Sequence, residues 1–108
     1  MRLILTDAAK TDIRKILRTT LAQFGPLQVP KYRVLIADAR KRIRDNPELG
    51  HHRPDLPPEG RAFHISQRGK PASHIFLYFV DEVASTVVVV RVLHDAMDMP
   101  RHWPKNPR

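Results

Sequence analysis

The chain has 108 residues, the usual size of one domain, and this length predicts a single hydrophobic core. Hydrophobic residues make up 42% and charged residues 28% of the sequence, which excludes a disordered or fibrous protein. The absence of cysteine excludes disulfides and thiolate metal sites. Nineteen Lys and Arg against eleven Asp and Glu give a net charge of +8, which attracts nucleic acid, a ribosome or an acidic protein segment.

The apolar stretches are too short to cross a membrane. The longest of them, 75–80 and 87–90, fall far short of the roughly 20 residues that a membrane-spanning helix needs. The start of the chain, with Arg2 before a brief apolar run at 3–5, does not match a secretory signal peptide. We therefore expect a cytoplasmic protein without a membrane partner.

Residues 1–5 predict a short strand, and Thr6 or Asp7 can cap the helix that follows it. Apolar residues in this helix recur at spacings of three and four, and basic residues lie off the stripe they form. Gly25 and Pro26 end the helix, because glycine suits the cap and proline cannot continue the helix. The stripe consists of Ala9, Ile13, Ile16, Leu17, Leu21 and Phe24.

A second helix is predicted from about Gln28 to Asp45, with Pro30 in its first turn and Asn46-Pro47 at its end. The short turn between the two helices predicts an antiparallel helical hairpin. A run of basic residues from Lys31 to Arg44 marks the solvated side of this helix. The buried face is expected to consist of Tyr32, Leu35, Ile36, Ala39 and Ile43.

The rest of the chain predicts a loop and then a sheet. Residues 47–60 contain four prolines and two glycines and are expected to form a loop. Three strands, at 61–67, 74–81 and 84–94, predict an antiparallel meander with turns at 67–71 and 81–82. The last two strands are apolar on both faces, so the helices should cover at least one face. The fold class is therefore α+β, with one domain over 1–108.

The end of the last predicted strand carries the most informative string of the sequence. Four valines at 87–90 lead into Arg91 and His94, which places a guanidinium and an imidazole at the edge of a rigid sheet. Strand alternation puts Arg91 on the same face as Val89 and Leu93. Both polar side chains can therefore face a partner.

Structural roles compete with this interpretation. Arg91 can instead be a half-buried fork that pairs with Asp95 or Asp98 and ties down the end of the chain. His94 can cap the edge of the sheet by bonding a neighbouring backbone group. The two kinds of role remain open from the sequence alone.

The C-terminal tail, 95–108, offers the same choice. Asp98 is expected to cap a short helical turn that begins at Met99-Pro100. Met97 and Trp103 are expected to pack onto the body of the domain. An exposed Trp103 would instead be an anchor for a partner, because tryptophan is enriched among the residues that dominate binding energy.

Taken together, these strings resemble the ParE branch of the RelE/ParE toxin superfamily. The resemblance spans nearly the whole chain in the same order, and the joint pattern is more specific than any piece of it. The strings that carry it are Phe24-Gly25, Asn46-Pro47-Glu48-Leu49-Gly50, Gly60-Arg61, His74-Ile75-Phe76, Arg91-Val92-Leu93-His94 and Met97-Asp98.

The resemblance implies a cytoplasmic bacterial toxin, held inactive by an acidic ParD-like antitoxin, which inhibits DNA gyrase by binding it and uses no cofactor. Direct sequence-specific binding of nucleic acid is not expected. The candidates for contact with the target are Arg91, His94, Asp98, Arg101, His102 and Trp103. The candidates for contact with the antitoxin are Lys31, Arg40 and Arg44.

The sister branch, of RelE type, suggests an alternative function as a ribosome-dependent messenger RNA endoribonuclease. Cleavage of RNA needs a base, an acid and cations on the phosphate. Arg61, Arg91 and His94 are the candidate catalytic residues for this chemistry, with Glu59 as a nearby carboxylate. The +8 charge alone would also fit a plain nucleic-acid-binding module, but no motif supports one.

The tyrosines argue against the ribonuclease. RelE-like toxins tend to have a tyrosine near the last strand, but Asp95 follows His94 here. Tyr32 and Tyr78 both lie in patterns that predict core positions. The sequence therefore favours a toxin that binds its target and has no catalytic residues.

No metal site is expected either. Two imidazoles that bind one metal from a helix need a four-residue spacing, and no pair of histidines has it. The glycines are isolated, so a phosphate-binding loop is absent from the sequence. The histidines are His51, His52, His64, His74, His94 and His102.

Overall fold

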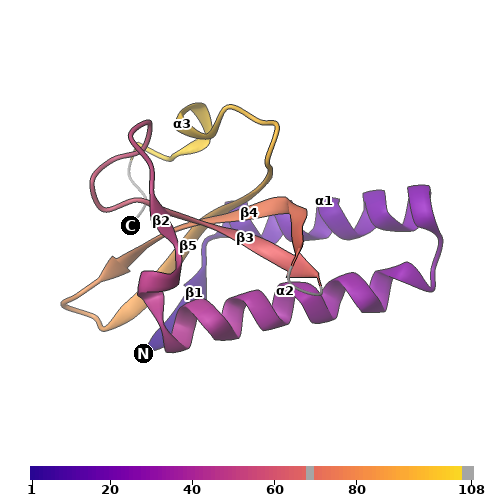
Figure 1. Ribbon diagram of the computed structural model, residues 1–108, viewed down its shortest axis with the longest axis horizontal. Helices are drawn as coiled ribbons and strands as arrows, with labels where there is room; N and C mark the ends of the chain where they lie inside the picture. The colour runs from indigo at the N-terminus through magenta and orange to yellow at the C-terminus, as the bar shows by residue number, and fades with distance from the viewer. Residues whose placement is uncertain (68–69, 106–108) are drawn as a thin grey trace.

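The computed structural model describes residues 1–67 and 70–105. A strand, β1 (Arg2–Leu5), leads into two long helices, α1 (Asp7–Phe24) and α2 (Gln28–Asp45), which form an antiparallel hairpin (Figure 1). These elements lie where the sequence predicts them. The α+β class and the helical hairpin are confirmed.

The sheet is larger than the predicted meander. Its strands are β2 (His51–His52), β3 (Arg61–Gln67), β4 (Lys70–Asp81) and β5 (Thr86–His94) together with β1, in the order β1-β5-β4-β3-β2. The pairs β3–β4 and β4–β5 are antiparallel, which confirms the meander, whereas β1 lies parallel to β5. A short helix, α3 (Met99–His102), follows the sheet.

Three boundaries differ from the sequence prediction. The stretch expected to be a loop, 47–60, contains a 3-10 helix, η1 (Pro47–Leu49), and β2, which is too short to show an alternating pattern. β4 begins at Lys70, inside the turn predicted at 67–71, and residues 68–69 of that turn lie outside the described residues. β5 begins at Thr86, because the turn before it extends through Ser85, whose φ is 50°.

Thr6 joins the start of α1 to the sheet. Its hydroxyl accepts a hydrogen bond from the Ala9 amide at 3.1 Å, so Thr6 and not Asp7 caps the helix. The same hydroxyl donates to the carbonyl of Val90 at 2.8 Å. At the other end of α1, Gly25 adopts the positive φ of 84° that the hairpin turn requires.

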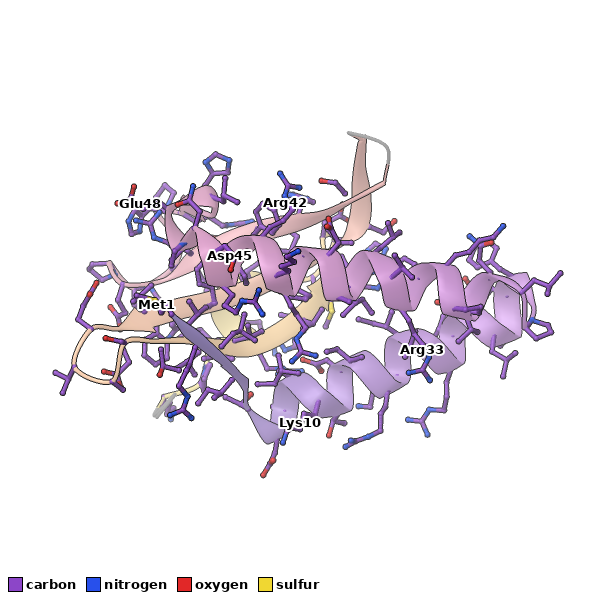
Figure 2. All side chains as sticks on the ribbon, turned by 90° about the horizontal axis from the view of Figure 1, so that it is seen from below. Met1, Lys10, Arg33, Arg42, Asp45 and Glu48 are labelled. Atoms are coloured by element: carbon purple, nitrogen blue, oxygen red, sulfur yellow. The ribbon has the colours of Figure 1, made fainter. Side chains whose placement is uncertain are left out.

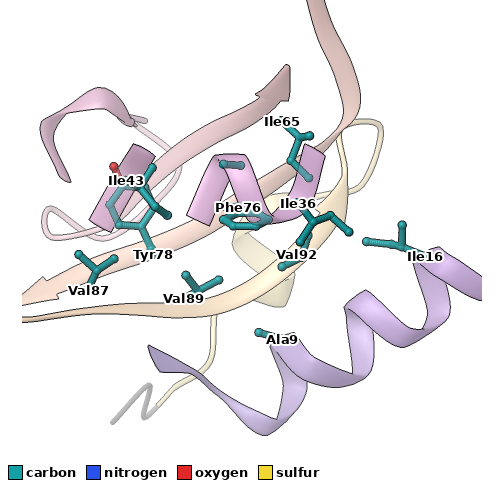
Figure 3. Packing of buried hydrophobic residues seen from close by; sticks show 11 residues of the cluster. Ala9, Ile16, Ile36, Ile43, Ile65, Phe76, Tyr78, Val87, Val89 and Val92 are labelled. Atoms are coloured by element: carbon teal, nitrogen blue, oxygen red, sulfur yellow. The ribbon is translucent and has the colours of Figure 1, made fainter. Parts of the chain in front are cut away.

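Each face of the sheet has its own core. The helix-side core packs α1 and α2 against the sheet through residues that include Ile16, Ile43, Phe76 and Tyr78 (Figure 3). The tail-side core covers the opposite face with the loop and the tail, and Figure 1 shows α3 on that side. Its buried members are Leu56, Ala62, Ile75, Leu77, Phe79, Val88, Val90, Leu93 and Met99.

The apolar stripe of α1 is only partly buried. Ala9 and Ile16 are buried, but Leu21 is 49% and Phe24 is 69% exposed, so the prediction is wrong for the last turns. Figure 1 shows the reason, since the tip of the hairpin extends past the end of the sheet. Within the described residues, no helix is long and apolar enough to cross a membrane.

A bulge in β5 changes which side chains share a face. Leu77 pairs with Arg91 and Tyr78 pairs with Val89, so Val90 is an extra residue. Leu93 therefore lies in the tail-side core, away from the face of Val89, and the predicted alternation is wrong beyond the bulge.

Candidate functional site

Arg91 is held by Asp12 of α1. The Nε and Nη2 atoms of Arg91 donate to the two carboxylate oxygens of Asp12 at 2.7 and 2.9 Å. The Val92 amide donates to the same carboxylate at 3.0 Å. The Asp12 side chain is only 8% exposed, and its hydrogen bonds raise the pKa of Arg91.

The position of Asp12 follows from the end of β1. The last residue pair between β1 and β5 is Leu5 with Val89, so β1 does not reach the Val92 amide and the Asp12 carboxylate accepts from it instead. The structural fork expected at Arg91 is confirmed, but the partner predicted from the sequence, Asp95 or Asp98, is wrong. The sequence feature that could have indicated the correct partner is the position of Asp12, an acidic residue on the buried stripe of α1.

Four of the six target-contact candidates gather around one hollow of about 420 Å³, which we call the tail hollow. It lies where the tail passes the start of α1, and Lys105 adds another cation. Asp98 and His94 do not line it. The four candidates in it are Arg91, Arg101, His102 and Trp103.

The tail packs against the sheet through two residues. The ring of Trp103 lies 6.4 Å from that of Phe79, centroid to centroid, and Met99 is 1% exposed. The packing expected for Trp103 is confirmed, whereas Met97 is 40% exposed and Met99 occupies the buried position instead. Asp98 precedes α3 as expected, but its side chain makes no capping hydrogen bond. The last residues of the tail, 106–108, lie outside the described residues.

His94 belongs to a different cleft, which we call the histidine cleft, of about 420 Å³. Its ring lies 5.5 Å from the ring of His74 on the neighbouring strand. The Nδ1 atom of His74 lies 2.5 Å from the hydroxyl of Tyr32 on α2. Asp95 lies beside this group, with carboxylate oxygens 3.3 Å from His94 Nδ1 and 3.8 Å from His64 Nε2.

The surroundings of Tyr32 and His74 in the cleft determine the protonation of these two side chains. Burial, helped by the charge of Asp95, raises the pKa of Tyr32 to about 12. Burial and the nearby His94 lower the pKa of His74. The phenol is therefore protonated and the imidazole neutral near pH 7, so Tyr32 donates to His74 Nδ1.

Sequence reasoning missed this cleft. Tyr32 was expected only in the core, and it is indeed partly buried against the helix-side core. His74 is part of a string that resembles the ParE family, and the sequence gives no reason to place it in a site. In the structure it pairs directly with His94 between β4 and β5. The strand register brings the two rings together, and that register cannot be read from the sequence.

Arg61 holds the loop that follows α2. Its Nη1 atom donates to the carbonyl of Gly50 at 2.8 Å. The hydroxyl of Tyr78 donates to the Pro47 carbonyl and accepts from the Gly50 amide at 2.9 Å. The core position predicted for Tyr78 is confirmed, and Arg61 and Glu59 line a separate hollow of about 490 Å³.

The antitoxin candidates on α2 are all exposed, but they do not form one group. Arg40 and Arg44 line a small hollow of about 190 Å³ beside Leu3 of β1. Arg44 also lies 3.0 Å from a carboxylate oxygen of Asp45. Lys31 lies near the other end of α2 and outside this hollow. Figure 2 shows this side of the molecule, with Arg42 and Asp45 near the end of α2.

A family model described as the ParE toxin of the type II toxin-antitoxin system parDE matches residues 3–99. The chain belongs to this ParE toxin family. Its structure is similar to the chromosomal ParDE TA system from P. aeruginosa, with a TM-score of 0.71, 19% identity, and coverage of 87% of this chain and 95% of that chain. The likeness to the toxin-antitoxin complex RelBE2 from Mycobacterium tuberculosis has a TM-score of 0.58, with 21% identity over 86% and 95% of the two chains.

No curated protein matches the sequence. At these identities, the structural likenesses establish the fold of this ParE-family chain. The family resemblance inferred from the sequence is therefore confirmed by the match to residues 3–99.

The structure separates the residues that RelE-type cleavage would have used in this ParE-family chain. Arg61, Arg91 and His94 line three different hollows, and the two arginines are engaged by Gly50 and Asp12. In the described structure these three residues do not share one hollow. In the ranges 1–67 and 70–105, no group of three or more His, Asp or Glu side chains is placed to hold a metal ion.

Proposed function

We propose that this protein is a cytoplasmic toxin that inhibits DNA gyrase by binding it. An acidic ParD-like antitoxin neutralises the toxin. The observation that carries the proposal is the match of the ParE toxin family over residues 3–99. The separation of Arg61, Arg91 and His94 supports action by binding, because RNA cleavage needs its acid, base and cations at one phosphate.

The outer side of the hairpin is the surface that suits an antitoxin. A groove of about 430 Å³ runs between α1 and α2, with an apolar floor that includes Leu17 and Val29. Arg14, Arg18 and Arg33 stand along it, and Figure 2 shows Arg33 on the hairpin's outer side. An apolar floor between cations fits an amphipathic helix with acidic flanks. The exposed cations Lys31, Arg40 and Arg44 extend the positive charge along α2.

The tail hollow is the surface that we assign to the target. Arg101 and Lys105 are exposed cations at its rim, and the half-buried Trp103 forms part of its wall. Partly buried tryptophan beside arginine is a combination found where binding energy concentrates. Arg91 contributes to this surface through the guanidinium face that Asp12 leaves uncovered, because its side chain is 24% exposed.

The proposal is tested with the purified protein and its native host. Pull-down should recover a small acidic protein encoded in the adjacent reading frame, and the purified toxin should impair supercoiling by the host's gyrase. A host without such a neighbour, together with unimpaired gyrase, would contradict both halves of the proposal.

One observation favours the ribonuclease as a second candidate. The tyrosine that is absent after His94 in the sequence is supplied in space by Tyr32, 2.5 Å from His74, which pairs with His94. A phenol beside two imidazoles can exchange protons with a substrate. Purified protein added to a translating extract should leave messenger RNA intact, and site-specific cleavage in the ribosomal A site would favour this candidate over gyrase inhibition.

A further inference from the structure

The histidine cleft lies where four elements meet. The second half of α1, the first turns of α2, the start of β4 and the end of β5 enclose it. Among the side chains that the structure describes, its lining contains no Lys, Arg, Asp or Glu, although the protein carries a net charge of +8. Beside the imidazoles and the phenol, the polar groups in it come from Thr19, Thr20, Gln23, Gln28 and Ser73.

A hydrogen bond indicates the tautomer of the His74 imidazole in the cleft. The Nδ1 atom of His74 accepts from the hydroxyl of Tyr32, whereas the Nδ1 atom of His94 lies 3.1 Å from the Ala96 amide and 3.3 Å from an Asp95 carboxylate oxygen. A neutral imidazole that accepts at Nδ1 carries its proton on Nε2. In its neutral state His74 therefore carries an N–H donor at Nε2, and the His94 ring lines the cleft beside it.

An apolar wall completes the cleft. Ile16 lies in its lining, and Phe24 at the tip of the hairpin is 69% exposed. Donors next to an exposed aromatic ring suit a ligand that carries an oxygen acceptor beside an apolar group. We propose that the histidine cleft binds a carboxylate side chain of an acidic, amphipathic protein segment and takes up a proton as it does so.

The proton uptake follows from the surroundings of His74. The titratable groups that act on it are Tyr32 from α2, His94 from β5 and the carboxylate of Asp95, and α1 contributes none to the lining. Asp95 lies past the end of β5, between His94 and His64 of β3. Burial and His94 lower the pKa of His74 by more than the charge of Asp95 raises it, so the free protein keeps this imidazole neutral near pH 7. A carboxylate bound beside it would favour the charged form.

This inference rests on the proposed function, in which an acidic protein segment covers the toxin, and it names one place where such a segment binds. The phosphate groups of an RNA partner would present oxygen acceptors similar to those of a carboxylate. We favour a protein carboxylate, because the described part of the lining holds no Lys or Arg, the side chains that commonly bind phosphate.

The test is an NMR titration of the imidazole signals of the full chain. The probe is a short capped peptide rich in leucine and glutamate, and the matched control peptide has glutamine in place of every glutamate. The glutamate peptide should raise the pKa of His74 by about one unit or more. Its affinity should then rise by about tenfold as the pH falls through the His74 titration, because one unit of pKa corresponds to a tenfold change.

Variants connect this effect to the cleft. His74→Gln and His94→Gln should each weaken binding of the glutamate peptide, and His74→Gln should remove the pH dependence. His94 is half exposed, so His94→Gln reports on binding even if His74→Gln unfolds the domain. The control is His51→Gln, because His51 is exposed on β2 and lies outside the cleft.

Equal binding of the two peptides, or unchanged binding by His94→Gln, would overturn the proposal. A single-stranded RNA oligonucleotide that shifts His74 when the glutamate peptide does not would also overturn it and would support the ribonuclease. A toxin that binds an antitoxin without taking up a proton refutes this inference alone. A failure to find any antitoxin refutes the proposed function, and the peptide titration still tests the cleft.

Discussion

Asp12 shows how one residue can join a helix to a sheet. It sits three residues after Ala9 and four before Ile16 on the buried stripe of α1, where an acid would ordinarily destabilise the fold. Its charge is compensated by Arg91 and by the Val92 amide. The buried Asp12 carboxylate therefore accepts the hydrogen bond of the Val92 amide near the end of β5 and also fixes the direction of the Arg91 side chain.

Replacing Asp12 by alanine should destabilise the domain by about 3 kcal/mol, because it leaves the Arg91 guanidinium largely buried without its partner. Urea unfolding measures the change. The matched control is the double variant with Asp12→Ala and Arg91→Met, which removes both charges and should recover part of the loss. A cost of less than about 1 kcal/mol for Asp12→Ala would mean that solvent compensates Arg91.

Arg101 is a proposed target contact whose replacement can test target binding without changing the stability of the fold. It is exposed on α3 at the rim of the tail hollow. Arg101→Glu should weaken gyrase inhibition several-fold while changing the free energy of unfolding by about 0.5 kcal/mol or less. Lys10→Glu, at an exposed position of α1 outside the tail hollow, changes the net charge equally and serves as control. Equal effects of both variants on gyrase would show that only the overall charge matters.

At the scale of elements, the sequence predicts what depends on local pattern. Both helices, the hairpin turn at Gly25 and the central strands follow from spacing, caps and apolar runs. The bulge at Val90, the parallel pairing of β1 and the meeting of His74 with His94 depend on strand register. Register is fixed by contacts between distant segments of the chain. These features, and the histidine cleft that depends on them, therefore cannot be predicted from the sequence.

The loop after α2 owes its conformation to Gly50. A Cβ atom there would lie 2.3 Å from the hydroxyl oxygen of the buried Tyr78. Gly50→Ala should therefore cost about 2 kcal/mol or more through overpacking and loss of the Tyr78 hydrogen bonds. Gly25→Ala has free space and only the strain of a φ of 84°, so it should cost about 1 kcal/mol. The reverse order in thermal unfolding would contradict this account of the loop.

The contact of α2 with β4 makes the stability depend on pH. The pKa of His74 is lower in the folded chain than the value of about 6.5 expected when unfolded. The folded state therefore binds fewer protons, so its stability is full above about pH 6.5 and is lost as the pH falls through the folded-state pKa. His74→Gln should flatten this dependence in denaturant unfolding, and His51→Gln should preserve it. An unchanged slope in His74→Gln would mean that other groups cause the acid sensitivity.

For the whole molecule, the covered tail-side face is the decisive feature. Leu56, Met99 and Trp103 pack on the sheet opposite the helices, so both broad faces of the sheet are covered in the described structure. A partner protein must therefore bind outside the two faces of the sheet, for example on the helical hairpin or at the tail hollow. In the proposed function, the groove on the hairpin and the tail hollow are separate surfaces for the antitoxin and the target.

The most direct test of this account is a supercoiling assay of the host's gyrase with purified toxin. Toxin alone should inhibit supercoiling, toxin mixed with its antitoxin should not, and Arg101→Glu should inhibit weakly while keeping its antitoxin affinity. Full supercoiling activity at saturating wild-type toxin, with the toxin folded and able to bind its antitoxin, would contradict the claim that this protein acts by binding gyrase.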